Sequence, residues 1–171
     1  SKTESVPEPT PAPASTPAPI KPLIEDGNYY IKTSLNPNFY LDVAFSSPAD
    51  FAKVQLYSQW SKENKAQIWN IKHLGNNQIK SSLSGKLLSF NLNNVSNNEP
   101  VFLLSERNNN CSQIWQAEQV DGGFFFHTTC DEKKALDVNG ALAYYGTQIQ
   151  IWDKWSNTNK AQIWSLEKTL F

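Results

Sequence analysis

Two groups of polar and aromatic residues recur in this sequence with the same internal spacing. Each group has an acid, an amide 13 positions later and an aromatic residue two positions further: Asp42, Gln55 and Tyr57, then Asp137, Gln150 and Trp152. A carboxylate accepts charge-assisted hydrogen bonds, which are about twice as strong as neutral ones, and an amide both donates and accepts. A flat ring offers a stacking surface to an apolar face. This set of groups suits a ligand with neighbouring hydroxyls and an apolar C–H face, such as a sugar.

A short string accompanies both groups. The sequence NKAQIW occurs at residues 64–69 and again at 159–164, and in each case its Gln follows the amide of the group after 12 positions. A looser copy, CSQIW, stands between them at residues 111–115. Gln-Ile-Trp therefore occurs three times, whereas the longer string occurs only twice.

The unit around the middle copy lacks the polar group. In the same register it has Ser89 for the acid, Phe102 for the amide and Leu104 for the aromatic ring. We therefore assign Gln-x-Trp to the fold and the longer string to units that keep a site. The alternative, in which the two acids only cap turns, leaves the joint loss of three residues unexplained.

Short β-strands must position these residues. Runs rich in β-branched and aromatic residues alternate with Asn, Ser, Pro or Gly clusters, and no stretch carries a helical stripe with caps. The expected strands are residues 27–33, 39–44, 53–57, 67–72, 76–82, 86–92, 100–104, 113–119, 123–129, 134–139, 147–152 and 162–167. They form three units of four strands, at about residues 25–73, 74–120 and 121–169. Since four short strands cannot close a core alone, the units should pack around a pseudo-threefold axis.

Three in-register Gln-x-Trp motifs, 46 and 49 residues apart, resemble those of the ricin B-type lectins and related carbohydrate-binding modules. The resemblance covers roughly residues 25–169. It implies an all-β fold, the β-trefoil, with twelve strands, six in a short barrel and six in a hairpin cap. Fold alone does not assign function, because trefoils serve several functions.

The resemblance also implies which residues hold the sugar. In this family an Asp and an aromatic residue hold galactose or a related sugar, and these positions correspond to Asp42 with Tyr57 and to Asp137 with Trp152. Gln55 occupies a neighbouring polar position that could bond the sugar or orient the loop.

Several further residues complete the two predicted sites. Gln150 is the counterpart of Gln55. Gln67 and Gln162 are included with the sugar-binding residues, although we expect glutamines of this motif to hold neighbouring backbone as well.

The sequence departs from the family at one position. The residue directly before the motif Gln is usually an Asn that reaches the sugar, but here it is Ala66 or Ala161. Asn64 and Asn159, two residues earlier, could replace it if the loop turns differently. Otherwise each site has one polar contact fewer, which predicts low affinity and weakens the assignment of galactose.

Other aromatic residues are candidates for a subsite. Trp60 and Trp155 occur only in the two units with a polar group, where they either wall a sugar subsite or pack beneath the loop. Tyr144 and Tyr145, in the loop after Asp137, are candidates for contacting a second sugar residue. The corresponding first loop contains Phe45 and Phe51, so we do not expect the two sites to share one preference.

The two cysteines are expected to pair. Cys111 precedes the last strand of the second unit and Cys130 follows the first strand of the third. The intervening VDGG carries a strong tight-turn signal, Asp-Gly, and counting outward from it places the cysteines nearly opposite one another. A disulfide is favoured over two buried thiols because we expect an extracellular module, and extracellular proteins keep their cysteines paired.

The first 22 residues differ from the rest of the chain. They hold seven of the ten prolines and no aromatic residue, which predicts a disordered, semi-rigid spacer of about 3 Å per residue. Residues 23–171 are long enough for one domain with a core. A spacer suggests an upstream domain in the same polypeptide, although a simple disordered tail is the alternative.

Composition argues against several functional classes. The net charge is −1 and there is no basic run, so we expect no nucleic-acid partner. No apolar stretch approaches the roughly 20 residues that cross a bilayer, so we expect no membrane insertion by this domain. The only histidines, His73 and His127, have no partner that the sequence can place, and no metal-binding spacing occurs. We therefore predict a non-enzymatic module without metal or cofactor.

The leading hypothesis is a secreted or cell-surface lectin module that targets an attached glycosidase or toxin to glycans, with galactose-type ligands favoured. The alternative is a degenerate trefoil that binds a protein partner through its loops.

Overall fold

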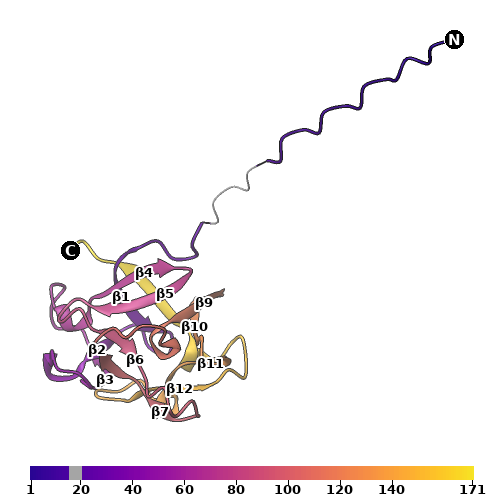
Figure 1. The fold of residues 1–171 in the computed structure, drawn as a ribbon. Helices are drawn as coiled ribbons and strands as arrows, with labels where there is room; N and C mark the ends of the chain where they lie inside the picture. The colour runs from indigo at the N-terminus through magenta and orange to yellow at the C-terminus, as the bar shows by residue number, and fades with distance from the viewer. Residues whose placement is uncertain (16–20) are drawn as a thin grey trace.

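A computed structural model describes residues 1–15 and 21–171 of the chain (Figure 1). Residues 1–15 are exposed and form no helix or strand. The predicted linker, residues 1–22, includes residues 16–20, which lie outside the described residues. Among the residues that the structure describes, none belongs to a helix long and apolar enough to span a membrane.

Strands dominate the domain, and the described ranges contain thirteen of them. In chain order they are β1 (Gly27–Thr33), β2 (Phe39–Val43), β3 (Val54–Ser58), β4 (Trp69–Leu74), β5 (Asn76–Ser81), β6 (Leu87–Ser89), β7 (Glu99–Pro100), β8 (Phe102–Leu104), β9 (Trp115–Val120), β10 (Gly123–Thr128), β11 (Asp131–Val138), β12 (Ile149–Asp153) and β13 (Trp164–Lys168). Short 3₁₀ helices lie between some of them: η1 (Ala44–Ser46), η2 (Lys65–Gln67), η3 (Cys111–Gln113), η4 (Asn139–Ala141) and η5 (Lys160–Gln162).

Six strands close into a barrel. β1 pairs with β4, β4 with β5, β5 with β9, β9 with β10, β10 with β13, and β13 returns to β1, all antiparallel. The remaining strands form hairpins beside this ring: β2 with β3, β6 with β8, and β11 with β12, which β7 extends. Each repeat thus gives two strands to the barrel and a hairpin to the cap, which is the β-trefoil arrangement (Figure 1).

The three motif tryptophans form the centre of the core. Trp69, Trp115 and Trp164 are fully buried, at 0% exposure. Each indole Nε1 donates to a backbone carbonyl in the second strand of its own repeat: Trp69 to Leu41 (3.0 Å), Trp115 to Leu88 (3.1 Å) and Trp164 to Leu136 (3.1 Å). Each accepting leucine directly precedes the residue at the site position of its repeat, which is Asp42, Ser89 or Asp137. The motif therefore fixes the strand that carries the site position in all three repeats.

The strand count differs from the sequence prediction of twelve. The run at residues 100–104 divides at Val101 into β7 and β8, because its two halves pair with different neighbours. Pro100 pairs with Gln150 of the third repeat, and Val101 N donates to Ile149 O at 2.9 Å. After Val101 the chain turns to β6 of its own repeat. Periodicity alone carries no signal for such a change of partner.

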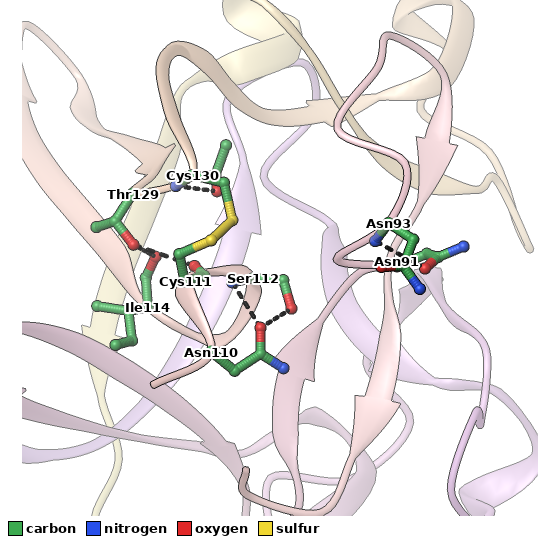
Figure 2. The surroundings of a disulfide bond; sticks show 9 residues. Asn91, Asn93, Asn110, Cys111, Ser112, Ile114, Thr129 and Cys130 are labelled. Carbon is green, nitrogen blue, oxygen red and sulfur yellow. Dashed lines mark hydrogen bonds between the residues drawn. A yellow bond between two sulfur atoms is a disulfide. The ribbon is translucent and has the colours of Figure 1, made fainter. Parts of the chain in front are cut away.

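The hairpin of β9 and β10 joins the second and third repeats. Val120 pairs with Gly123 around the two-residue turn Asp121–Gly122. Gly123 has a φ of 153°, and a Cβ there would lie 2.2 Å from Trp164 O, so only glycine fits. Cys111 and Cys130, just outside the two ends of this hairpin, form a disulfide with a Cα–Cα distance of 5.0 Å (Figure 2).

Candidate functional site

Acid and amide side chains meet in two of the three hairpins. Asp42 of β2 stands opposite Gln55 of β3, and Gln55 Nε2 donates to Asp42 Oδ1 at 3.0 Å. Asp137 of β11 stands opposite Gln150 of β12, and Gln150 Nε2 donates to Asp137 Oδ1 at 2.9 Å. The spacing of 13 residues in the sequence therefore corresponds to cross-strand neighbours, which is why it recurs.

The second of these pairs lines a hollow of about 340 Å³ in the third repeat. It is lined by Asp137, Val138, Asn139, Gly140, Ala141, Gln150, Trp152, Trp155, Asn159 and Ala161. These residues come from β11, η4, β12 and the chain around the start of η5. One concave surface thus contains the acid, the amide and both tryptophans that the sequence singled out in this repeat.

The first pair lines a hollow of about 420 Å³ in the first repeat. It is lined by Asp42, Val43, Phe45, Ser46, Gln55, Tyr57, Trp60, Tyr145 and Gly146. The acid, the amide, Tyr57 and Trp60 again meet on one surface. This hollow also takes two residues, Tyr145 and Gly146, from the third repeat.

The aromatic rings of the two hollows are open to solvent to a similar degree. Tyr57 is 39% exposed and Trp152 is 38% exposed, while Trp60 and Trp155 reach 70% and 72%. The sequence left open whether Trp60 and Trp155 wall a subsite or pack beneath the loop. Their exposure and their place in the lining put both on the wall of a hollow.

Tyr145 lies in a different hollow from the one that its sequence position indicated. Although it follows Asp137 in the chain, its ring packs against Tyr57 of the first repeat, with centroids 5.1 Å apart, and Tyr144 lies beside it at 5.4 Å. Neither tyrosine lines the hollow of the third repeat. The loop that carries both tyrosines reaches from the third repeat to the first. The spacing of residues within one repeat gives no indication of such a contact between repeats.

Burial shifts the titration of both carboxyl groups. Desolvation raises the pKa of Asp137 to about 6 and also raises the pKa of Asp42 above its ordinary value. The amides of Gln55 and Gln150 oppose this shift because they donate to the ionised form. Near neutral pH, above the pKa of about 6, the Asp137 carboxylate is a charged acceptor with little water around it, which strengthens a bond from a ligand hydroxyl.

Asn64 and Asn159 cap the 3₁₀ helices that precede the motif tryptophans. Their Oδ1 atoms accept from Ala66 N and Ala161 N, each at 3.1 Å. Their Nδ2 atoms are buried without a hydrogen-bond partner among the described residues. Asn159 lines the hollow of the third repeat, whereas Asn64 does not line that of the first. The capping role shapes the loop in both repeats.

Gln67 and Gln162, which the sequence places with the sugar-binding residues, do not line either hollow. Both are fully buried, at 0% exposure, so neither reaches the surface of a hollow. Gln67 Nε2 donates to Ser58 O at 2.9 Å, and Gln162 Nε2 donates to Asp153 O at 3.1 Å. They act as positioning residues, because they hold the end of the third strand of their repeats.

The middle repeat uses the equivalent positions for packing. Ser89 is fully buried, its Oγ donates to Leu87 O at 2.8 Å, and it accepts from Gln113 Nε2 at 3.1 Å. Phe102 packs against Phe51, with ring centroids 5.1 Å apart. A hollow persists here, but no acid stands at the position of Asp42 and no ring at that of Tyr57.

Among the residues that the structure describes, no group of three or more His, Cys, Asp or Glu side chains is arranged to hold a metal ion. His127 contacts Glu118, which also accepts from Lys154 Nζ at 2.9 Å. This cluster lies outside both hollows.

A family model described as the ricin-type beta-trefoil lectin domain matches residues 27–164. A search of curated proteins finds no match. Among solved structures, the chain is similar to the designed threefold-symmetric protein ThreeFoil, with 25% identity and a TM-score of 0.74 over 82% of this chain and 98% of that chain.

Two natural proteins share the fold at lower identity. A mosquitocidal holotoxin has 24% identity and a TM-score of 0.76, over 86% of this chain and 18% of the toxin chain. The C-half of an earthworm R-type lectin, solved in complex with GalNAc, has 22% identity and a TM-score of 0.65, over 83% and 98% of the respective chains. At this identity the likeness establishes the fold alone.

Proposed function

This chain belongs to the family of ricin-type β-trefoil lectin domains, which bind carbohydrate, and we propose that its first and third repeats each hold one sugar site. In the first site Asp42 and Gln55 bond hydroxyls while Tyr57 stacks on the pyranose. In the third site Asp137 and Gln150 bond hydroxyls while Trp152 stacks.

The observation that carries this proposal is the matched pair of hollows. In both, a buried carboxylate is bonded to an amide at 2.9–3.0 Å, and a ring left open to solvent lines the same surface. The carboxylate can accept from neighbouring hydroxyls, and the amide can both donate and accept. A protein that only needed these residues for folding would bury the rings as well.

A galactose-type sugar is the ligand that we propose. The similar earthworm lectin was solved with GalNAc, a galactose derivative, and the Asp with an aromatic ring is the arrangement that the family uses for such sugars. Ala66 and Ala161 remove one polar contact from each site. We therefore expect dissociation constants near 1 mM, about −4 kcal/mol, at each site.

Two weak sites in different repeats also favour a multivalent surface. Binding of both sites to one dense glycan could raise avidity by about 10² or more, provided that the geometry allows simultaneous engagement. Single variants Asp42→Ala and Asp137→Ala should each leave one site that galactose titrates, while retention on a dense glycan surface falls sharply. Asp137→Ala should cost more, because the indole of Trp152 offers the larger stacking face.

The decisive experiment is a galactose titration of the purified protein, followed by NMR, for the wild type and for the double variant Asp42→Ala/Asp137→Ala. We expect no binding by the double variant. The matched control is Ser89→Ala, which alters the equivalent position of the middle repeat and should bind as the wild type does. Retained binding by the folded double variant would place the sugar elsewhere.

We further propose that the domain is secreted or displayed at a cell surface and delivers an attached effector to glycans. The disulfide between Cys111 and Cys130 suits an oxidising compartment. The proline-rich N-terminal segment suits a spacer, and in the similar holotoxin the matching part is only 18% of the chain. Fusing an unrelated enzyme before residue 1 should confer glycan retention on it, and the double variant should abolish that retention.

A further inference from the structure

Phe45 makes no contribution to the fold that the structure reveals. Its side chain is 101% exposed, which makes it the most exposed of the large apolar side chains in the described residues. Its backbone has φ 57° and ψ 20°, the left-handed region in which a residue with a Cβ is strained. None of the aromatic pairs among the described residues includes it.

The third repeat provides a direct comparison, because Gly140 occupies the same position, three residues after the acid. Gly140 has φ 64° and ψ 12°, and the following residues, Ala141 and Ser46, have φ values of 52° and 50°. The two turns therefore have the same backbone conformation. Glycine adopts this conformation without a steric penalty, whereas the first repeat places a phenylalanine there.

Phe45 is one of the residues that line the first-repeat hollow, together with Asp42, Tyr57 and Tyr145. Three of its four aromatic residues, Phe45, Tyr57 and Tyr145, come from three segments: η1, β3 and the loop that crosses from the third repeat. The hollow is also larger than its counterpart, at about 420 Å³ against about 340 Å³. A sugar bonded to Asp42 and stacked on Tyr57 would thus have further apolar surface beside it at the rim.

We propose that Phe45 forms a second stacking surface, which makes the first-repeat hollow a site for glycans of at least two sugar residues. The third-repeat hollow, with Gly140 at its rim, takes a single terminal sugar. The inference rests on the proposed sugar sites. Covering the exposed ring of Phe45 with the C–H face of a second sugar removes apolar surface from water, which provides the driving force.

The test isolates the first site in an Asp137→Ala background and compares galactose with galactose-terminated disaccharides, including lactose, by NMR titration. Adding Phe45→Gly should weaken the best disaccharide about 2- to 10-fold, the range that a stacking contact of about 0.5–1.5 kcal/mol gives. The affinity for galactose should change less than 2-fold, because galactose alone has no second sugar residue to place against the ring of Phe45. The thermal midpoint should stay the same or rise, by no more than about 4 °C.

Phe51→Gly is the matched control. Phe51 is also exposed, at 65%, and has a left-handed φ of 66°, but it lines the middle hollow. We expect no effect on either sugar in the Asp137→Ala background. Unchanged disaccharide affinity in the Phe45→Gly variant, or an equal loss for galactose, would overturn the inference while leaving the sugar sites in place. Failure of the Asp137→Ala parent to bind any of these sugars would instead overturn the proposed first site.

The reverse change tests the same idea in the other hollow. A Cβ at Gly140 would meet nothing within 4 Å. The φ of 64° strains any residue other than glycine, but Phe45 adopts the same backbone conformation in the first repeat, so Gly140→Phe copies an arrangement that the fold already holds. In an Asp42→Ala background, where only the third site remains, this variant should gain a preference for disaccharide over galactose. The opposite result is a variant that self-associates, as measured by analytical sedimentation, and gains no preference for disaccharide. That result would mean that an exposed ring at this position contacts protein, and it would contradict the proposal.

Discussion

Asp137 and Ser89 occupy the same position in their hairpins, yet the first lines a hollow and the second is bonded into the core. The motif glutamines respond to this difference. In the middle repeat Gln113 donates to Ser89 Oγ at 3.1 Å and accepts from Arg107 N at 2.9 Å, so both ends of its amide are satisfied.

In the first and third repeats, by contrast, the Oε1 atoms of Gln67 and Gln162 are buried without a partner among the described residues. Both repeats also bury a carboxylate. Unsatisfied polar groups and buried charges cost folding free energy. The middle repeat therefore has the local packing that favours stability. The first and third repeats lose some folding free energy at the positions that form the proposed binding sites. The following experiments test this comparison.

The motif tryptophans should be equally important in all three repeats, because they are shared scaffold. Trp69→Ala, Trp115→Ala and Trp164→Ala should each lower the free energy of unfolding by about 3–5 kcal/mol, as expected for a large core side chain. Urea unfolding measures this directly. The exposed Trp155→Ala is the control and should cost less than about 0.5 kcal/mol. A much smaller loss of unfolding free energy in one repeat would show that the three motif tryptophans do not contribute equally to the core.

The disulfide links the middle repeat, at Cys111, to the third repeat, at Cys130. Replacing both Cys111 and Cys130 by Ser should lower the free energy of unfolding by about 2–4 kcal/mol, because the cross-link restricts the unfolded chain. Galactose affinity should stay unchanged, since neither cysteine lines the two proposed sites. Chemical unfolding of the wild type with and without reductant provides the control. A loss of sugar binding in the folded variant would contradict the separation of scaffold from site.

Asp137→Asn should stabilise the fold while it weakens sugar binding. Burial raises the pKa of Asp137 to about 6 from an unfolded value near 3.8, so protonation favours the folded state. This stabilisation is fully present below the unfolded pKa and is lost as the pH rises through about 6. The neutral Asn avoids that loss, which should make the variant more stable at pH 8 by at most about 3 kcal/mol, the free energy that corresponds to the full rise in the pKa.

Thermal unfolding between pH 4 and pH 8 tests the sign. The gain from Asp137→Asn should shrink towards pH 4, and Asp121→Asn, which changes an exposed acid, should give no such trend. Sugar binding at the third site should respond in the opposite direction and strengthen as the pH rises through about 6, because the carboxylate is the better acceptor. Equal binding by the charged and neutral forms would remove Asp137 from the site.

Ser89→Ala should have the smallest effect. Gln113 Nε2 loses one acceptor but keeps Ser105 O at 3.0 Å, so the free energy of unfolding should fall by about 1 kcal/mol or less. Sugar binding should not change. A measurable drop in affinity, in the same galactose titration, would mean that the middle repeat also takes part in binding.

The sequence by itself determined much of the fold and the pairing within each site. The repeated Gln-x-Trp motif and the period-2 runs specified three repeats and the β-trefoil, and the spacing of 13 residues placed Asp42 opposite Gln55. The Asp121–Gly122 turn specified the hairpin of β9 and β10. These features depend on alternation, turn chemistry and register, which act between residues close in the chain or in one hairpin.

The tertiary structure alone decided which side chains reach a hollow. It buried Gln67 and Gln162, carried Tyr145 into the first repeat, and divided the strand at Val101 between two partners. It also left Phe45 on the rim. The physical reason is that burial and contact between repeats depend on how the barrel closes around its pseudo-threefold axis, and closure brings together residues whose separation no local pattern records.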